Sequence, residues 1–212
     1  MVVLGASTAL REVLGIVNAL NLNGDEIRVV GVLDDSSKLS NGFVSGIPVL
    51  GQLDSARSLS GVKFIFAIGS LTTQQDRSRI QSELGLDSED FINLIHPSAE
   101  VDSTASLGNG CIIHKGVSIG PGAQVGDFVV LAVNSAVGPD VIIENYSLVT
   151  SFVLLLTGVI LREACYVGSM SCVIENVEIG RYARVAAGTI VNRSIPDGAL
   201  AAGNPMRLLG RN

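Results

Sequence analysis

The side chains that most often do chemistry are few in this chain. Histidine occurs only at His96 and His114, so a three-histidine zinc site cannot form within one chain. The three cysteines are odd in number and form no CxxC pair. Asp34 and Asp35 follow an apolar run, where carboxylates either cap a turn or accept hydrogen bonds from ribose hydroxyls and base N–H groups. The sequence therefore predicts no metal site, and the two aspartates are candidate ligand contacts.

The composition excludes two classes of partner. The net charge of −6 and the pI of about 4.8 leave no basic surface for nucleic acid. The longest apolar run, 152–161, is broken by Thr157 and Gly158 and falls short of the roughly 18 residues that span a membrane. The start VVLGAS lacks the basic stretch and cleavage site of a signal peptide. We therefore expect a cytoplasmic protein with neither nucleic-acid nor membrane partners.

Strands and helices alternate along residues 1–92. Apolar runs predict strands at 2–5, 27–35, 63–70 and 91–95. Helical spacing predicts helices at 7–20, with Ser7 as the N-cap, and at 72–84. This order indicates a small Rossmann-like parallel sheet, in which ligands bind at the carboxyl ends of the strands. Those ends carry Gly5-Ala6-Ser7, Asp34-Asp35 and Gly69-Ser70.

A strict six-residue period begins at residue 101. Every sixth residue from Val101 to Val191 is Val, Ile or Leu, over sixteen hexads without a break. The fifth position of each hexad is small or β-branched throughout, as at Cys111 and Cys165. This period predicts a left-handed parallel β-helix of about five coils, in which three hexads close one triangular coil. The first position points inward and the fifth fills a corner.

The same repeat assigns the cysteines. Cys111 and Cys165 lie at corners three coils apart, roughly 14 Å at the usual strand spacing of about 4.8 Å. A disulfide cannot span that distance, so both are predicted to be core residues.

The segments VVLGAS, GVLDD, FAIGS, IHPSAEV, the hexads and AAGNPMRLLG together resemble the hexapeptide-repeat sugar acyltransferases, typified by sialic-acid and bacillosamine acetyltransferases. The resemblance implies a nucleotide-sugar-binding α/β domain over 1–92, a linker over 93–100, an acyl-CoA-binding β-helix over 101–196 and a tail over 197–212. It also implies a homotrimer with active sites between subunits, acetyl-CoA as the co-substrate, and a role in polysaccharide biosynthesis. The implied reaction is N-acetylation of a nucleotide-linked amino sugar.

The resemblance also implies ligand contacts. A full GxGxxG is absent, which argues against a nicotinamide cofactor, although a phosphate can still sit at the helix N-terminus near Ser7. Arg207 would meet a CoA phosphate or remain solvated. The implied nucleotide-sugar contacts are Gly5, Ala6, Ser7, Asp34, Asp35 and Ser70, and the implied CoA contacts are Gly168, Ser169, Ala186, Gly188 and Arg207.

The hexad VGPDVI (137–142) lies where the family usually carries its general base, a histidine followed by an acid. Here Pro139 takes the histidine position and Asp140 follows. Other polar positions of the family align with Ala132 and Leu148. Asp140 and His114 are the remaining catalytic candidates. Asp140 would be a weak base, and His114 is expected to be an exposed turn residue on another face, reaching the site only from a neighbouring subunit.

Three functions fit these observations. The first is N-acetyl transfer without a protein base, because a neutral amine is already a good nucleophile. The second is transfer to a hydroxyl, or transfer of a longer acyl chain. The third is a non-catalytic binding or scaffold protein. A trimer is expected in each case, because outward apolar residues would form one large exposed patch: Leu148, Phe152, Leu154, Leu156 and Ile160.

Overall fold

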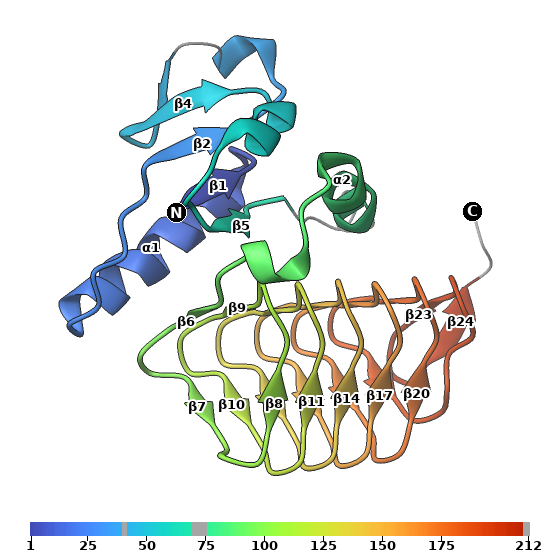
Figure 1. The fold of residues 1–212 in the computed structure, drawn as a ribbon. Helices are drawn as coiled ribbons and strands as arrows, with labels where there is room; N and C mark the ends of the chain where they lie inside the picture. The colour runs from blue at the N-terminus through green and yellow to red at the C-terminus, as the bar shows by residue number, and fades with distance from the viewer. Residues whose placement is uncertain (40–41, 69–75, 210–212) are drawn as a thin grey trace. The chain divides into compact units, whose positions relative to one another are not determined.

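The computed structural model describes residues 1–39, 42–68 and 76–209, which form two compact units (Figure 1). The first unit covers Met1–Pro97 and the second Ser98–Asn212, so the boundary falls within the predicted linker 93–100. Gly69 and Ser70, which were predicted to end a strand, lie outside the described residues. In the described ranges, neither α-helix has the length and apolar character that a bilayer crossing requires.

The first unit is built on a five-stranded sheet in the order β3-β4-β2-β1-β5. All neighbouring strands are parallel except β3 and β4, which form an antiparallel hairpin. The core of the sheet is the fully apolar β1, whose three residues are inaccessible to solvent. In chain order the elements are β1 (Val2–Leu4), α1 (Thr8–Leu22), β2 (Gly31–Leu33), η1 (Ser37–Leu39), β3 (Phe43–Val44), β4 (Ile47–Gly51), η2 (Leu53–Ser58), β5 (Phe64–Phe66), α2 (Asp76–Leu84), η3 (Ser88–Asp90) and β6 (Leu94–Ile95).

Helix α1 forms where the sequence predicts it. The Ser7 hydroxyl accepts a hydrogen bond from the Ala9 N–H at 3.2 Å and so caps the first turn. The buried residues Leu10, Val13 and Val17 recur at helical spacing and give α1 one apolar face.

Two strand predictions were wrong in extent or place. Strand β2 is shorter than 27–35, because the Asn21 carboxamide bonds both the N–H and the carbonyl of Ile27 and keeps it out of the ladder. The segment 91–95 does not join the five-stranded sheet. Phe91 makes a single bridge to Phe64, and its ring stacks on Phe66 with centroids 4.9 Å apart.

The hairpin of β3 and β4 was missed by the sequence reasoning. Ser45 and Gly46 connect the two strands with φ values of 49° and 80°. Positive φ at both central residues is typical of the tight turns that join antiparallel strands. The hairpin extends the sheet by two strands and leads directly into η2.

The second unit is a left-handed parallel β-helix, as the six-residue period predicts. Strands stack in three sheets, with the orders β22-β19-β16-β13-β10-β7, β20-β17-β14-β11-β8 and β24-β23-β21-β18-β15-β12-β9 (Figure 1). The strands are β7 (Glu100–Val101), β8 (Ser106–Leu107), β9 (Ile112–Ile113), β10 (Ser118–Ile119), β11 (Gln124–Val125), β12 (Val130–Leu131), β13 (Ala136–Val137), β14 (Ile142–Ile143), β15 (Leu148–Val149), β16 (Leu154–Leu155), β17 (Ile160–Leu161), β18 (Tyr166–Val167), β19 (Cys172–Val173), β20 (Glu178–Ile179), β21 (Arg184–Val185), β22 (Ile190–Val191), β23 (Leu200–Ala202) and β24 (Arg207–Leu209).

The repeat closes every 18 residues. Ser118 pairs with Ala136, and Ala136 pairs with Leu154, so each strand bonds the strand three hexads later. The first hexad position points inward and is buried from Ile113 onward. The fifth position is also buried, as Cys111 and Cys165 show, and both cysteines are free thiols. The predicted core positions of the β-helix, including the two cysteines, are therefore confirmed.

The corners of the coil require left-handed backbone. Asp140, Phe152 and Met170 have φ values of 55°, 59° and 60°, while other coils place glycine at the equivalent corner position, as at Gly122. A left-handed residue other than glycine costs roughly 1–2 kcal/mol, so the hydrogen-bonded stack must hold these corners in place.

The outward apolar residues do not form one patch, and that expectation was wrong. Leu148, Leu154 and Ile160 belong to β15, β16 and β17, which lie in three different sheets. Each hexad turns the chain onto the next side of the triangle, so residues six apart face different directions. Phe152 and Leu154 remain exposed, at 57% and 41%.

The segment predicted as a tail continues the sheet. Strand β23 pairs in parallel with β21, and β24 folds back antiparallel onto β23. The β-helix therefore ends in a hairpin, and Arg207 lies in its last strand.

Candidate functional site

The loop Gly5-Ala6-Ser7 joins β1 to α1, and its polar groups are bonded within the fold. The Ser7 hydroxyl donates to the Ala67 carbonyl at 2.6 Å. The Ala6 N–H donates to Oδ2 of Asp34 at 2.7 Å, and the Gly5 N–H donates to the Leu33 carbonyl at 2.8 Å. A carboxylate therefore occupies the Ala6 N–H, next to the helix start where a phosphate was considered.

Asp34 joins two loops at the carboxyl edge of the sheet. Its Oδ2 holds Ala6, and its Oδ1 accepts from the Ser36 N–H at 2.9 Å. Its own N–H donates to the Gly51 carbonyl at 3.0 Å, which connects it to the end of β4. Both carboxylate oxygens are thus committed to backbone donors of the same unit.

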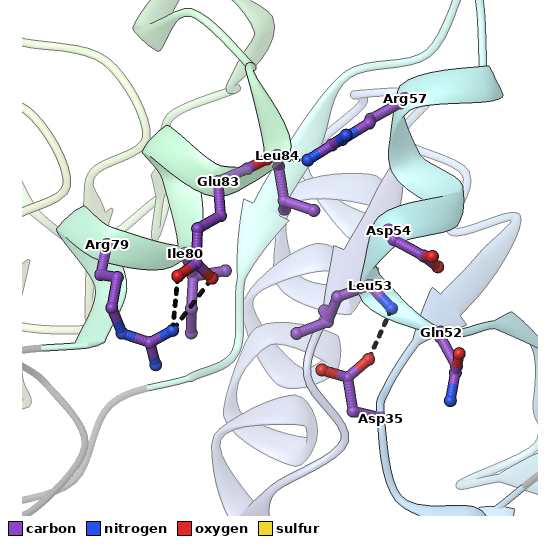
Figure 2. Close-up of a pocket in the computed structure, with 9 residues that line it drawn as sticks. All are labelled: Asp35, Gln52, Leu53, Asp54, Arg57, Arg79, Ile80, Glu83 and Leu84. Carbon is purple, nitrogen blue, oxygen red and sulfur yellow. Dashed lines mark hydrogen bonds and ion pairs between the residues drawn. The ribbon is translucent and has the colours of Figure 1, made fainter.

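Asp35 has a different environment. Its side chain is exposed, and its Oδ1 accepts from the Leu53 N–H at 2.9 Å. The other carboxylate oxygen points toward the α2 side of a pocket (Figure 2). The sequence placed the two aspartates together, but the structure separates them into one that braces a loop and one that lines a cavity.

The pocket has a volume of about 540 Å³, within the range of small-molecule sites. Leu53 and Asp35 lie on one side, and Ile80, Glu83 and Leu84 of α2 lie on the other (Figure 2). Its lining residues are Asp35, Gln52, Leu53, Asp54, Arg57, Arg79, Ile80, Glu83 and Leu84. Except for Asp35, sequence reasoning missed this lining, because most of the rest comes from η2 and α2 and the hairpin that leads into η2 was not recognised.

Charges around the pocket are largely paired. Arg79 bonds the Glu83 carboxylate at 2.9 Å and Asp76 at 3.4 Å, and the Arg57 guanidinium donates to the Glu83 carbonyl. The side-chain hydrogen bond to Glu83, followed by that to Asp76, raises the pKa of Arg79. The lining holds three carboxylates and two guanidinium groups, a formal charge of −1.

In the β-helix, VGPDVI is a normal rung of the coil. Val137 and Val141 are buried, while Pro139 and Asp140 form an exposed turn. The Asp140 N–H donates to the Pro121 carbonyl at 2.9 Å. A Cβ on Gly122, one coil earlier, would lie 2.4 Å from Oδ1 of Asp140, so the carboxylate packs against that glycine. The rung places an acid, but no histidine, at this corner.

The expectation that His114 is an exposed turn residue was wrong, because it is only 7% exposed. It follows the buried Ile113 at the end of β9, ahead of the turn. Strands β9 and β13 belong to different sheets, as predicted, so His114 and Pro139 lie on different sides of the coil.

The residues implied for CoA lie on successive coils of one sheet. Gly168 follows β18 and Ala186 follows β21, 18 residues later. The Gly188 N–H donates to the Ser169 carbonyl at 2.8 Å, and the Ser169 hydroxyl donates to Thr150 Oγ1 at 3.0 Å. A Cβ on Gly168 would lie 2.6 Å from the backbone nitrogen of the next coil, so this position leaves no room for a side chain. Arg207 is exposed in β24, at the end of the same sheet.

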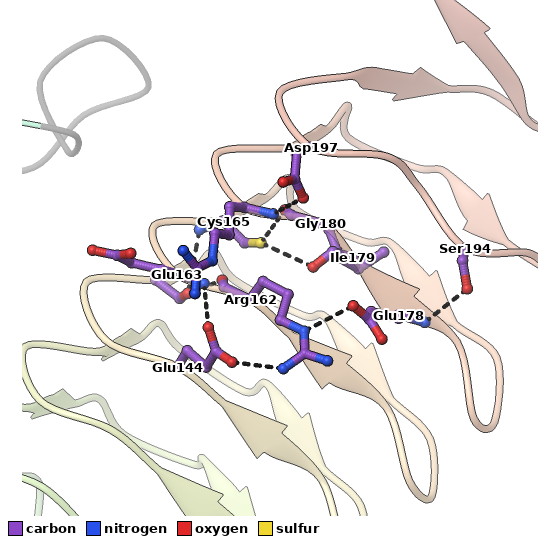
Figure 3. Close-up of polar contacts among 11 residues, drawn as sticks. Glu144, Arg162, Glu163, Cys165, Glu178, Ile179, Gly180, Ser194 and Asp197 are labelled. Atoms are coloured by element: carbon purple, nitrogen blue, oxygen red, sulfur yellow. Dashed lines mark hydrogen bonds and ion pairs between the residues drawn. The ribbon is translucent and has the colours of Figure 1, made fainter.

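A second polar cluster holds three coils together. Arg162 bonds Glu144 at 2.8 Å and Glu178 at 2.7 Å, and Figure 3 shows it between the two carboxylates. The nearby Cys165 thiol contacts the carbonyls of Ile179 and Gly180, and burial raises its pKa to about 12. A thiol of that kind is protonated and inert at neutral pH, so this cluster is structural rather than nucleophilic.

No group of three or more His, Cys, Asp or Glu side chains within 1–39, 42–68 and 76–209 could hold a metal ion.

Solved structures of sugar N-acetyltransferases match almost the whole chain. A perosamine N-acetyltransferase from Caulobacter crescentus, in a histidine-to-asparagine variant bound to CoA and GDP-perosamine, is 27% identical with a TM-score of 0.84. The match covers 99% of this chain and 96% of that one. The acetyltransferase domain of PglB from Neisseria gonorrhoeae, bound to acetyl coenzyme A, is 26% identical with a TM-score of 0.83, covering 98% of each chain.

Curated relatives match over shorter stretches, and no model of a known protein family matches the chain. The UDP-N-acetylbacillosamine N-acetyltransferase of Bacillus subtilis is 35% identical over 91 residues, which are 42% of this chain and 40% of that protein. Serine acetyltransferase of Escherichia coli is 33% identical over 105 residues, 45% of this chain and 38% of that protein. The chain thus spans about two fifths of the length of these curated relatives. With its α/β unit, its hexapeptide β-helix and these relatives, the chain belongs to the hexapeptide-repeat sugar acyltransferases.

Proposed function

We propose that the protein transfers the acetyl group of acetyl-CoA to the amino group of a nucleotide-linked amino-deoxy sugar. The observation that carries this proposal is the match over both units to N-acetyltransferase structures, one bound to CoA and GDP-perosamine and another to acetyl coenzyme A. The α/β unit holds the nucleotide and the β-helix holds acetyl-CoA.

Within the α/β unit, Asp35 contacts the nucleotide, and Asp34 positions the loop Gly5-Ala6-Ser7. The bonds from Asp34 to the Ala6 and Ser36 N–H groups support the positioning role. In the β-helix, the backbone around Gly168, an uncrowded approach for the pantetheine arm, lies on the sheet that also carries Arg207.

The chemistry proceeds without a histidine at residue 139. The neutral amine attacks the thioester carbonyl carbon, the C–S bond breaks, and CoA leaves as a thiolate that takes up the proton released by the amine through solvent. Positioning and stabilisation of the oxyanion supply the rate. Asp140, exposed at the corner, orients the substrate ammonium before its proton is lost.

The pH dependence of kcat/KM tests this account. Its logarithm should rise with unit slope and level off near the pKa of the free amine, because kcat/KM reports the free species. His114→Asn should leave the curve in place, and Asp140→Asn should lower it by no more than about tenfold. A limb near pH 6.5 that disappears in His114→Asn would instead make histidine the base.

We also propose that the protein is a homotrimer. Phe152, Leu154 and Met170 support this, since they are 57%, 41% and 74% exposed on adjacent coils of one monomer. Sedimentation at micromolar concentration should give the trimer mass, and a stable monomer would refute the proposal. A cytoplasmic location and a role in polysaccharide biosynthesis stay predictions from the sequence. No separate observation favours a hydroxyl acceptor, a longer acyl chain or a scaffold role.

A further inference from the structure

We propose that the pocket between β2, η2 and α2 binds the base of the sugar nucleotide and prefers guanine to uracil or thymine. This inference rests on the proposed function, since it names the nucleotide that the α/β unit takes. It is carried by the charge of the pocket, its apolar walls and the environment of Asp35.

The charge of the pocket favours the neutral end of a nucleotide. The lining has a formal charge of −1, and the guanidinium of Arg79 is already paired with Glu83 and Asp76. A pyrophosphate placed here would face the Asp35 carboxylate without a free cation to balance it. The uncharged base avoids this repulsion.

The walls of the pocket suit a flat aromatic ring. Leu84 is 5% exposed, and Leu53 and Ile80 are half-buried beside it. These three aliphatic side chains come from opposite sides of the pocket (Figure 2). A base lying against them would remove apolar surface on both partners from water.

Asp35 then selects among bases by its lack of donors. The Leu53 N–H fixes its Oδ1, and the second oxygen points to the α2 side of the pocket (Figure 2). An ionised carboxylate only accepts hydrogen bonds. Guanine presents two adjacent donors, N1–H and the N2 amino group. Uracil and thymine present one N3–H flanked by two carbonyl oxygens, which the carboxylate would repel.

Calorimetry on the full chain with GDP, UDP, dTDP and ADP tests the inference. We expect GDP to bind at least about tenfold more tightly than UDP or dTDP, the discrimination typical of a two-bond contact to a base edge. Asp35→Asn keeps an acceptor for the Leu53 N–H but puts an amino group in place of the free oxygen. It should remove the preference for GDP, with UDP binding unchanged or improved. The matched control is Asp25→Asn, an exposed aspartate outside this pocket.

Three outcomes would overturn the inference. Tighter binding of UDP or dTDP by the unmodified protein would remove the guanine preference and leave the proposed function standing. An equal loss for all four nucleotides in Asp35→Asn would mean that Asp35 contacts the ribose, which they share apart from its 2′-hydroxyl. Absence of binding by any of the four would overturn the proposed function as well.

Discussion

Replacing Asp34 by alanine should destabilise the α/β unit itself, and not only weaken a ligand. The carboxylate makes one partly buried hydrogen bond, to the Ala6 N–H at 2.7 Å, and one exposed bond, to the Ser36 N–H at 2.9 Å. A hydrogen bond to a charged group contributes roughly 1.5–3 kcal/mol when buried, and water replaces much of the exposed one. We therefore expect Asp34→Ala to lower the free energy of unfolding by about 2–3 kcal/mol.

Urea unfolding followed by circular dichroism at a helical wavelength measures this loss. Among the described residues both α-helices, α1 and α2, belong to the first unit, so the helical signal follows its unfolding. Asp25→Ala, which removes an exposed carboxylate of the same unit, should change the unfolding free energy by less than about 0.5 kcal/mol. If Asp34→Ala leaves the unfolding midpoint unchanged while nucleotide affinity falls, then Asp34 is a direct ligand contact and the positioning role is wrong.

Three further predictions concern the β-helix. Gly168→Ala should destabilise it by about 1–3 kcal/mol by overpacking the next coil, whereas Ala132→Gly in the same column should cost less, as denaturant titration would show. The hydrogen bond from Arg162 lowers the pKa of Glu178 below its ordinary value of 4.5, so its stabilisation is present above pH 4.5 and is lost as pH falls through the folded pKa. Arg162→Ala should therefore lower the Tm at pH 7 and have little effect at acid pH; an equal effect at both would contradict the pairing. Cys165, with a pKa of about 12, should resist iodoacetamide at pH 8 in the native state and react in urea, as peptide mass spectrometry would show.

The β-helix could be predicted almost residue by residue, because its period is a direct consequence of its geometry. A side chain that points inward every sixth residue must be apolar, and Val137 in the rung VGPDVI obeys this as closely as its neighbours. What the period does not encode is which outward positions meet. Leu148 and Leu154 are six residues apart and were expected in one patch, yet they lie on different sheets.

The α/β unit was less predictable, since its short strands depend on side-chain bonds that a pattern does not reveal. The Asn21 carboxamide removes Ile27 from the predicted second strand, and the turn at Ser45 adds a hairpin. The pocket depends on the helix η2 that follows this hairpin. The sequence thus identified Asp35 as a contact but not the apolar walls, such as Leu84, that surround the space it faces.

The pairing of Ser118 with Ala136, 18 residues later, makes the length of the β-helix a quantised property. Removing one hexad would rotate everything that follows by one side of the triangle, so every inherited surface would face a new direction. Removing or duplicating 18 residues would restore the orientation and change only the height, by one strand spacing of about 4.8 Å. Evolution of such a chain is therefore free to adjust its reach in steps of a whole turn, while shorter insertions are confined to loops bulging from the corners.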